Sequence, residues 1–411
     1  MIPTQTIPAQ VSAARRQGSS TSSLPLYAGL AVLAFCACWT LFGSFVVPAA
    51  RLHDFLNLYA GASLARDGDF ARMHAPEVQL EREREYAPQL PELVPFVRPS
   101  FYALFLAPLA WLPFGAAFWA WLGVQASMLV GAWAWAFRRW GTDALIVGSM
   151  YLPTALGIAH GQDCVLVLWI VLGSYALAQR GRHFLSGVLL GAGLIKFHLF
   201  LLWPIMLLIQ RRWRMLAGAC AAVTAEVLTS LALAGPSGIT KYVALLRMSD
   251  LRRLNPSPEL MINARSIALN FRVDNTAVTA LLTAAAVILT VAACWRAPLW
   301  RAVAAASAGS LLVAPHVYGY DAGLLLAGLW FAIFESSEHP GSKGPRITAT
   351  ALFTPIPMLL NLAGSPLAAA TALALFAFLA SLAWTSRSIS LETTQASSLE
   401  TTQVTSQEAM A

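Results

Sequence analysis

The sequence predicts an all-α, polytopic membrane protein. Hydrophobic residues make up 57% of the 411 positions and charged residues only 11%, whereas soluble domains carry about 25% charged residues. The mean hydropathy is +0.62, and long uncharged runs alternate with short clusters of arginine. A soluble protein of this size could not cover its surface with so few charges, so most of the chain is expected to lie in a bilayer.

The net charge of +7 does not indicate a nucleic-acid-binding protein. The basic residues stand at the ends of apolar runs, which is the pattern of topology signals and lipid-headgroup contacts. The five cysteines all fall within apolar runs and are interpreted as small buried residues. No zinc-binding or P-loop motif occurs, so neither a metal nor another cofactor is expected.

The uncharged runs give the spans, and the arginines between them give the orientation. Arg15 and Arg16 precede the first run, which places the N-terminus in the cytoplasm. A span takes about 20 apolar residues, and on this basis the runs predict ten spans. These are 26–47, 115–137, 144–160, 162–179, 215–234, 276–295, 302–315, 319–335, 347–363 and 366–385.

Two segments are predicted to form short broken helices. The uncharged run from Pro99 to Phe137 is followed by Arg138 and Arg139. If this run formed two spans, the two arginines would lie outside, where basic residues are disfavoured. A half-buried helix at 99–112, broken near Pro113, avoids this. The segment 184–209 must leave the cytoplasm and return to it, so it is predicted to be a pair of short helices hinged near Lys196.

The domain organisation that follows is one transmembrane domain, 24–385, with a cytoplasmic tail at each end. The tails, 1–23 and 386–411, are polar and predicted to be disordered. The outer loops are about 48–98, with six arginines and eight acids, and 235–275, with six basic and three acidic residues. A basic outer loop indicates contact with phosphate headgroups or an anionic ligand, or only a soluble surface.

Polar and ionisable residues gather at the predicted outer ends of spans, where burying them unpaired is costly. They occur in four stretches, RLHDF, IAHGQDC, LIKFHLF and APHVYGYD, which converge on one outward-facing cavity if the helices form a bundle. The members are His53, Asp54, His160, Gln162, Asp163, Lys196, His198, His316, Tyr318, Tyr320 and Asp321.

Three ionisable residues have two interpretations each. Asp54 can take a proton from a hydroxyl nucleophile, with His53 sharing that task, or it can cap a helix. Lys196 is the best candidate for a phosphate contact, or it is a snorkelling lysine that reaches the interface. Glu226 lies in the middle of a predicted span. It is either a proton site of a transporter or a neutral or paired carboxyl within the bundle, and the second interpretation is favoured.

The ordered set of stretches resembles glycosyltransferase family 87, the polyprenyl-phosphate-sugar-dependent mannosyltransferases of the GT-C fold. The stretches are His-Asp-Phe to Ala-Arg-Asp-Gly at 53–68, Arg-Pro-Ser-Phe-Tyr-Ala-Leu to Ala-Pro-Leu-Ala at 98–110, His-Gly-Gln at 160–162, Gly-Val-Leu-Leu-Gly to Ile-Lys-Phe at 187–197, and Ala-Pro-His to Tyr-Asp at 314–321. The sequence departs from the family where Phe197 and His198 replace the usual proline after the lysine. It also has Arg98 where an aromatic residue is usual.

The resemblance implies a GT-C-like bundle and an inverting hexosyltransferase. It would move mannose or another hexose from a polyprenyl-phosphate donor to a hydroxyl of a lipid or glycan acceptor, on the outer face of a bacterial-type plasma membrane. The family's catalytic base carries over onto Asp54. The expected contacts to the lipid phosphate are Lys196, Arg98, His316, Arg265 and His198, and the supporting polar cluster is His53, His160, Gln162, Tyr320 and Asp321.

Two other classes of function remain open. A lipid or polysaccharide transporter or flippase would need internal repeats and ion sites within the membrane, and the sequence shows no convincing repeat. A non-catalytic scaffold would not need to keep Asp54, Lys196 and His316. Substituting Asp54 and Glu226 distinguishes the transporter from the enzyme.

Overall fold

The computed structural model describes residues 54–250, 257–273, 275–336 and 343–385. Within these ranges the chain is helical and contains no strand, and several helices are suited to a membrane. The prediction of an all-α polytopic membrane protein is therefore confirmed. The predicted span 26–47, the residue His53 and both predicted tails lie outside the described residues.

The helices of the N-terminal half lead from the first outer loop into the apolar runs. They are α4 (Asp54–Arg66), α5 (Pro76–Tyr86), α6 (Ser100–Leu106), η2 (Ala107–Trp111), α7 (Phe114–Trp140), α8 (Thr142–Ser149), α9 (Leu152–Ala159), α10 (Cys164–Gln179), α11 (His183–Gly191), η3 (Ala192–Phe200) and α12 (Trp203–Ile209).

The C-terminal half begins with the longest helix. Its elements are α13 (Trp213–Asp250), η4 (Pro258–Leu260), α14 (Ala264–Asn270), α15 (Thr276–Cys294), α16 (Leu299–Val313), η5 (Gly319–Leu324), α17 (Leu325–Trp330), η6 (Phe331–Glu335), α18 (Lys343–Phe353), α19 (Ile356–Leu362) and η8 (Leu367–Ala369). The last apolar helix extends from Leu367 to Thr385.

In the part of the chain that the structure describes, fewer helices are suited to cross a membrane than the sequence predicts there, and the prediction of ten spans is not confirmed. Among the described residues, five helices are long and apolar enough to cross a membrane, or six if α8 and α9, bent by 51°, form one span. Helices α10 and α16 have only 16 and 15 residues, and the run 319–335 is divided among η5, α17 and η6. An uncharged run indicates apolar surroundings but not that one straight helix fills it.

Both predicted helix breaks are present. The short helix before Pro113 ends at Trp111, and α7 begins at Phe114. Lys196 interrupts η3 with non-helical angles (φ −131°, ψ 57°). By contrast, the second outer loop does not begin at 235, because α13 continues through a kink at Gly235 to Asp250. A proline follows this glycine, and proline is tolerated in the first turn of the next helical segment.

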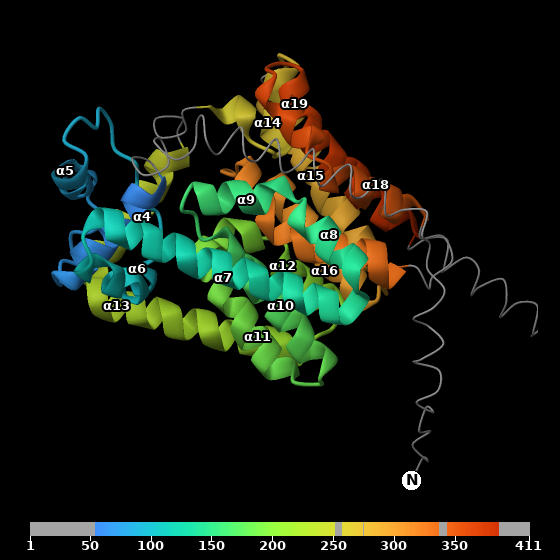
Figure 1. The fold of residues 1–411 in the computed structure, drawn as a ribbon, viewed down its shortest axis with the longest axis horizontal. Coiled ribbons are helices and arrows are strands. Elements are labelled where there is room, and N and C mark those ends of the chain that lie inside the picture. The colour runs from blue at the N-terminus through green and yellow to red at the C-terminus, as the bar shows by residue number, and fades with distance from the viewer. Residues whose placement is uncertain (1–53, 251–256, 274, 337–342, 386–411) are drawn as a thin grey trace, which may run out of the picture.

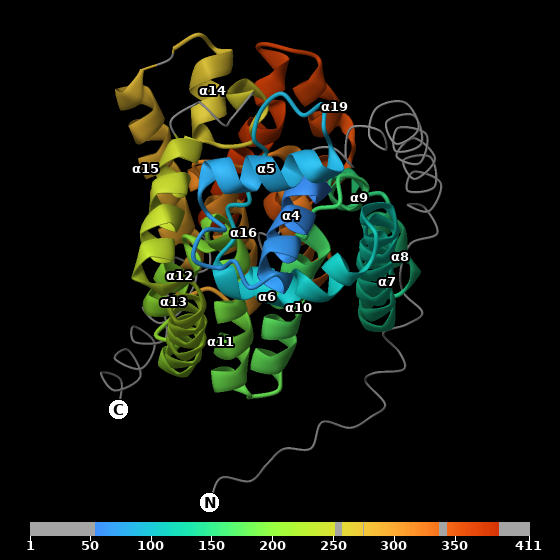
Figure 2. The ribbon, with the colours of Figure 1, turned by 90° about the vertical axis from the view of Figure 1, so that its left-hand side faces the viewer.

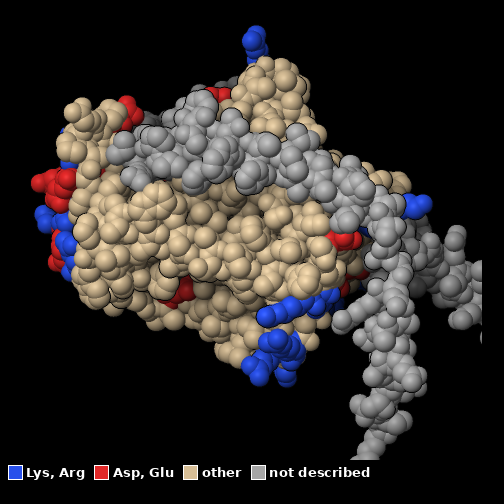
Figure 3. Space-filling model, viewed as in Figure 1, with Lys and Arg blue, Asp and Glu red and all other residues tan. Residues whose placement is uncertain are grey.

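The helices stack into a body with the predicted first outer loop at one end. In Figure 1, α7, α10, α11 and α13 lie across the body, while α4, α5 and α6 form its left end and α14, α18 and α19 its top. Figure 2 shows α4 packed between α5 and α6. On the face drawn in Figure 3 most of the middle is uncharged, charged side chains gather at the left end, and basic side chains gather at the bottom around α11.

Helix α5 holds the non-helical segment that leads to Arg98. Two fully buried side chains four residues apart on α5, Gln79 and Glu83, face this segment. The backbone N–H of Phe96 donates to Gln79 Oε1 at 2.9 Å, and that of Val94 donates to Glu83 Oε2 at 3.1 Å. These bonds satisfy backbone groups that a helix or sheet would otherwise pair.

The end of the same segment is held by His74. Its Nε2 lies 2.9 Å from the carbonyl oxygen of Arg98, and its ring lies against Tyr242 of α13, with centroids 4.7 Å apart. Burial lowers the pKa of His74 to about 4, so the ring is neutral at pH 7 and Nε2–H donates. The backbone of Arg98 is therefore fixed before its side chain enters the bundle.

Glu83 is expected to make the first outer loop sensitive to pH. Burial raises the pKa of its carboxyl from 4.5 to about 8. The folded loop therefore keeps a proton that the unfolded chain releases, and stability is lost as the pH rises from about 4.5 to 8. Glu83→Gln, which keeps an acceptor for Val94, should remove this loss and raise the thermal midpoint at pH 8 by a few degrees.

The measurement is thermal unfolding in nanodiscs at pH 5 and pH 8. Glu81→Gln changes an exposed carboxylate on the same helix and is the matched control. Equal pH dependence of Glu83→Gln and the unsubstituted protein would show that Glu83 is ionised in the fold.

Candidate active site

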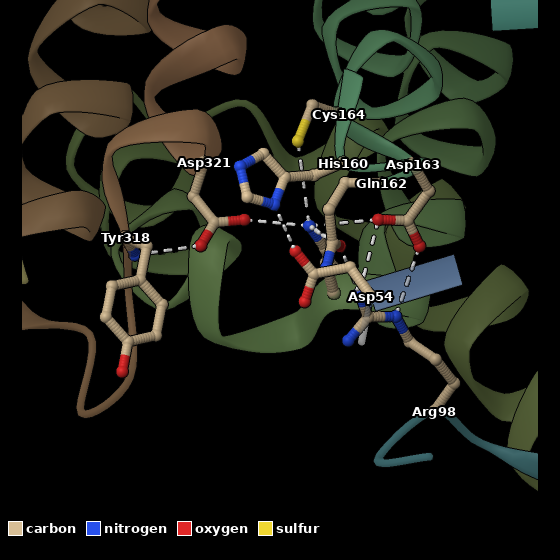
Figure 4. Close-up of polar contacts among 9 residues, drawn as sticks. Asp54, Arg98, His160, Gln162, Asp163, Cys164, Tyr318 and Asp321 are labelled. Atoms are coloured by element: carbon tan, nitrogen blue, oxygen red, sulfur yellow. Dashed lines mark hydrogen bonds and ion pairs between the residues drawn. The ribbon is translucent and has the colours of Figure 1, made fainter. Parts of the chain in front are cut away.

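The site begins with a contact between two predicted residues, Asp54 and His160. Asp54 is the first residue of α4, and His160 follows the last residue of α9. His160 Nδ1 lies 2.7 Å from Asp54 Oδ2, as Figure 4 shows. The two side chains are 30% and 20% exposed, so this pair is accessible from outside the protein.

The turn 160–163 is seated directly on α4. Gly161 has φ +69°, which disfavours any residue with a Cβ, and a Cβ there would lie 2.8 Å from the Cβ of Phe55. The indole N–H of Trp121 donates to the carbonyl oxygen of Gly161 at 2.8 Å. The backbone next to His160 is therefore fixed against the residue next to Asp54.

Behind this pair lies a group of four buried charges, which we call the buried quartet: Arg98, Asp163, Lys196 and Asp321. Arg98 binds Asp163 through two nitrogens, at 3.1 and 3.2 Å. Lys196 Nζ lies 2.9 Å from Asp163 and 2.7 Å from Asp321. Each residue is less than 10% exposed. Two positive and two negative charges alternate, so the quartet is neutral.

Gln162 completes the coordination of the two cations. Its Oε1 accepts from Lys196 Nζ at 3.1 Å and from Arg98 at 3.4 Å. Lys196 thus has an acceptor for each of its three protons in Gln162, Asp163 and Asp321. The snorkelling interpretation of Lys196 is wrong, because the side chain is buried and paired.

A series of aromatic and imidazole rings connects the Asp54 pair to His198. Tyr320 lies 5.4 Å from His160 and 5.9 Å from Tyr318, measured between ring centroids. The series continues to His316, 5.1 Å from Tyr318, and then to His198 at 6.4 Å. His198 is 9% exposed, and its Nε2 has no hydrogen-bond partner in the described part of the chain. A buried polar nitrogen without a partner is a candidate contact for a ligand.

Most predicted site residues come together. The structure unites Asp54, Arg98, His160, Gln162, Lys196, His198, His316, Tyr320 and Asp321. Arg265 lies on α14 and forms no hydrogen bond or ion pair with them in the described residues. Asp163 was recognised at its turn but not as a site residue, although an acid at the start of an apolar run needs a buried partner.

The donor set does not suggest a metal centre. Among the described residues, no three or more His, Cys, Asp or Glu side chains are grouped so as to hold an ion. The buried carboxylates Asp163 and Asp321 are instead bound by Lys196 and Arg98. The absence of a cofactor from the reaction stays a prediction.

Breaking the neutrality of the quartet should destabilise the protein. Lys196→Met leaves a net charge of −1 and Asp321→Asn leaves +1, and removing one member of a buried pair costs about 3–5 kcal/mol. The double variant is neutral again, so its loss should be smaller than the sum of the single losses by about 1–3 kcal/mol. Denaturant unfolding in nanodiscs measures this coupling.

The pair of Asp67 and Arg82, 2.7 Å apart and with side chains 35% and 17% exposed, is the matched control nearer the surface. The cycle of Asp67→Asn and Arg82→Met should give a coupling below about 1 kcal/mol. Strict additivity in the quartet would contradict its description as one electrostatic unit.

Gly161→Ala should damage the site more than the same change at another left-handed glycine. Gly68 also has a positive φ, +78°, but a Cβ there meets nothing within 4 Å. Gly68→Ala therefore reports backbone strain alone, about 1–2 kcal/mol, whereas Gly161→Ala adds the collision with Phe55. Unfolding measurements on both variants test this, and equal losses would show that Phe55 moves aside freely.

Comparison with known proteins gives one family match. Residues 96–317, more than half of the chain, match glycosyltransferase family 87. The match includes the turn 160–163 and Lys196, while Asp54 and Asp321 lie outside its limits and join it through contacts in the structure. Neither the curated proteins nor the solved structures give a match. The match over more than half of its length shows that this chain belongs to glycosyltransferase family 87.

Proposed function

We propose that this membrane glycosyltransferase transfers a hexose, such as mannose, from a polyprenyl-phosphate donor to a hydroxyl of a lipid or glycan acceptor. Asp54 takes the proton of the acceptor hydroxyl, and the oxygen attacks the anomeric carbon with inversion as the bond to the lipid phosphate breaks. Family membership supports the reaction type. The assignment of donor and base rests on the arguments below.

The observation that carries the assignment is the difference among the three carboxylates of the site. Asp163 and Asp321 are buried and bound by the cations of the quartet. Asp54 is partly exposed, and its partner in the described residues is the imidazole of His160. A general base needs access to the substrate and a free lone pair, and the partial exposure of Asp54 supports its assignment to this role.

The leaving phosphate is assigned to the imidazole end of the ring series. Lys196 and Arg98 are already neutralised within the quartet, so an added phosphate would gain little net Coulomb attraction from them. His198 has the unpaired buried Nε2, and His316 lies beside it. Imidazole N–H groups aimed at developing negative charge would stabilise the transition state. We therefore propose that Lys196 and Arg98 position the site, and Arg265 is left as a predicted contact.

The sidedness is supported by the ends of α10. Asp163 precedes its first residue, while Arg180 follows its last and Arg182 comes two residues later. Sixteen residues of α-helix span about 24 Å, so the site and these arginines lie at opposite ends. Because basic turns favour the cytoplasm, the site faces outward in the proposed orientation, at the plasma membrane.

Asp54→Asn is expected to reduce sugar transfer by about 10²–10⁴-fold, the usual contribution of a general base. The assay uses purified protein in nanodiscs with polyprenyl-phosphate-mannose and a lipid acceptor, and thermal unfolding checks the fold. Asp69→Asn is the matched control, because Asp69 has the same 20% side-chain exposure and an exposed partner, Arg72. Undiminished transfer by Asp54→Asn would remove Asp54 as the base.

A transport function predicts different activities for the variants Asp54→Asn and Glu226→Gln. Glu226 on α13 has one buried carboxyl oxygen without a hydrogen-bond partner in the described residues, as a proton site in a transporter could have. Loss of activity in Glu226→Gln with full activity in Asp54→Asn would favour the transporter. The enzyme predicts the reverse pattern.

A further inference from the structure

The backbone is held in place at both residues of the contact between His160 and Asp54. His160 Nδ1 and Asp54 Oδ2 are 2.7 Å apart, and the neighbours Gly161 and Phe55 are in close contact. The backbone N–H of His160 also donates to Leu156 of α9 at 2.9 Å. Both ends of the hydrogen bond are thus anchored by backbone packing that does not involve the two side chains themselves.

This geometry restricts the carboxylate of Asp54. A carboxylate at the start of a helix can rotate about two side-chain torsions, so its oxygens are not directed by the backbone alone. A donor at Nδ1 holds Oδ2 and leaves Oδ1 for the acceptor hydroxyl. Holding a base in one orientation lowers the entropic cost of reaching the reactive arrangement.

We propose that His160 is a positioning residue for Asp54, an inference that rests on the proposed function of Asp54 as the base. The imidazole donates its Nδ1–H to Oδ2 and fixes the direction of Oδ1. The proton of the acceptor hydroxyl goes to Oδ1, while His160 keeps its own proton throughout. The turn 160–163 carries this donor, and through Asp163 it is bound to the buried quartet.

The proposal predicts different behaviour for two substitutions of His160. Asparagine can present its side-chain N–H near the position of Nδ1, whereas alanine cannot. His160→Ala should lower kcat by up to about 100-fold, the size of effect that misplacing a reacting group can have, with KM changed less than about threefold. His160→Asn should recover most of kcat and keep the pH profile of the unsubstituted enzyme, because no titrating imidazole is required.

The assay is the transfer reaction with polyprenyl-phosphate-mannose, run from pH 5 to pH 9 over a range of donor concentrations. His183→Asn, at the start of α11, removes a histidine from the opposite end of α10 and controls for the loss of an imidazole as such. Thermal unfolding is measured for every variant, and His160→Asn keeps the test valid if His160→Ala does not fold.

Three results would overturn the proposal. If His160→Asn is as slow as a folded His160→Ala, or loses one limb of the pH profile, the imidazole itself exchanges the proton. If KM rises while kcat is unchanged, His160 binds substrate instead. If His160→Ala keeps full kcat while Asp54→Asn is inactive, positioning fails but the proposed function stands. Transfer that survives Asp54→Asn would instead reject the assigned base.

Discussion

The buried quartet of Arg98, Asp163, Lys196 and Asp321 is the constraint on which the rest of the structure depends. A single unpaired charge in such surroundings would cost several kcal/mol, so all four must be buried together. They come from the segment before α6, the turn before α10, the break in η3 and the helix η5. The fold is therefore fixed where four elements meet, and the accessible residues are arranged around that meeting point.

Neutrality has a chemical consequence for the accessible residues. Because the quartet carries no net charge, it supports the site without attracting or repelling a charged substrate strongly. It also ties up two of the three carboxylates, which leaves Asp54 as the accessible one. Rigid support and reactivity are thus divided between different side chains. The turn 160–163 links them, since His160 contacts Asp54 while Gln162 and Asp163 contact the cations.

The sequence predicted much of the site because the signals were local. Apolar runs indicated helices, Pro113 indicated a break, and polar residues at the ends of runs indicated the clustered side chains. The pairing of Lys196 was not predictable, because its position between Ile195 and Phe197 fits a buried partner and a snorkelling side chain equally well. Only the approach of η5 and the turn 160–163, distant in sequence, decides between them.

The number of spans and the course of α13 were not predictable for a related reason. Hydropathy records which residues avoid water, but it does not distinguish a bent or short helix inside the bundle from one that crosses the bilayer. The runs that form α10 and α16 are apolar enough for spans and are only 16 and 15 residues long. Likewise, Gly235 and Pro236 bend α13 without ending it.

The stretch around α6 shows how the polar site and the apolar surface are joined. Arg98 is buried in the quartet, yet Phe105 and Trp111 a few residues later are 62% and 76% exposed. Arg66, at the end of α4, donates to the carbonyl oxygen of Ala110 at 2.6 Å. The helix that begins with Asp54 is thereby tied to a surface suited to lipid. A polyprenyl-phosphate sugar also has a polar part, the sugar phosphate, joined to an apolar chain. This match between the site with its neighbouring surface and the donor supports the proposed substrate class.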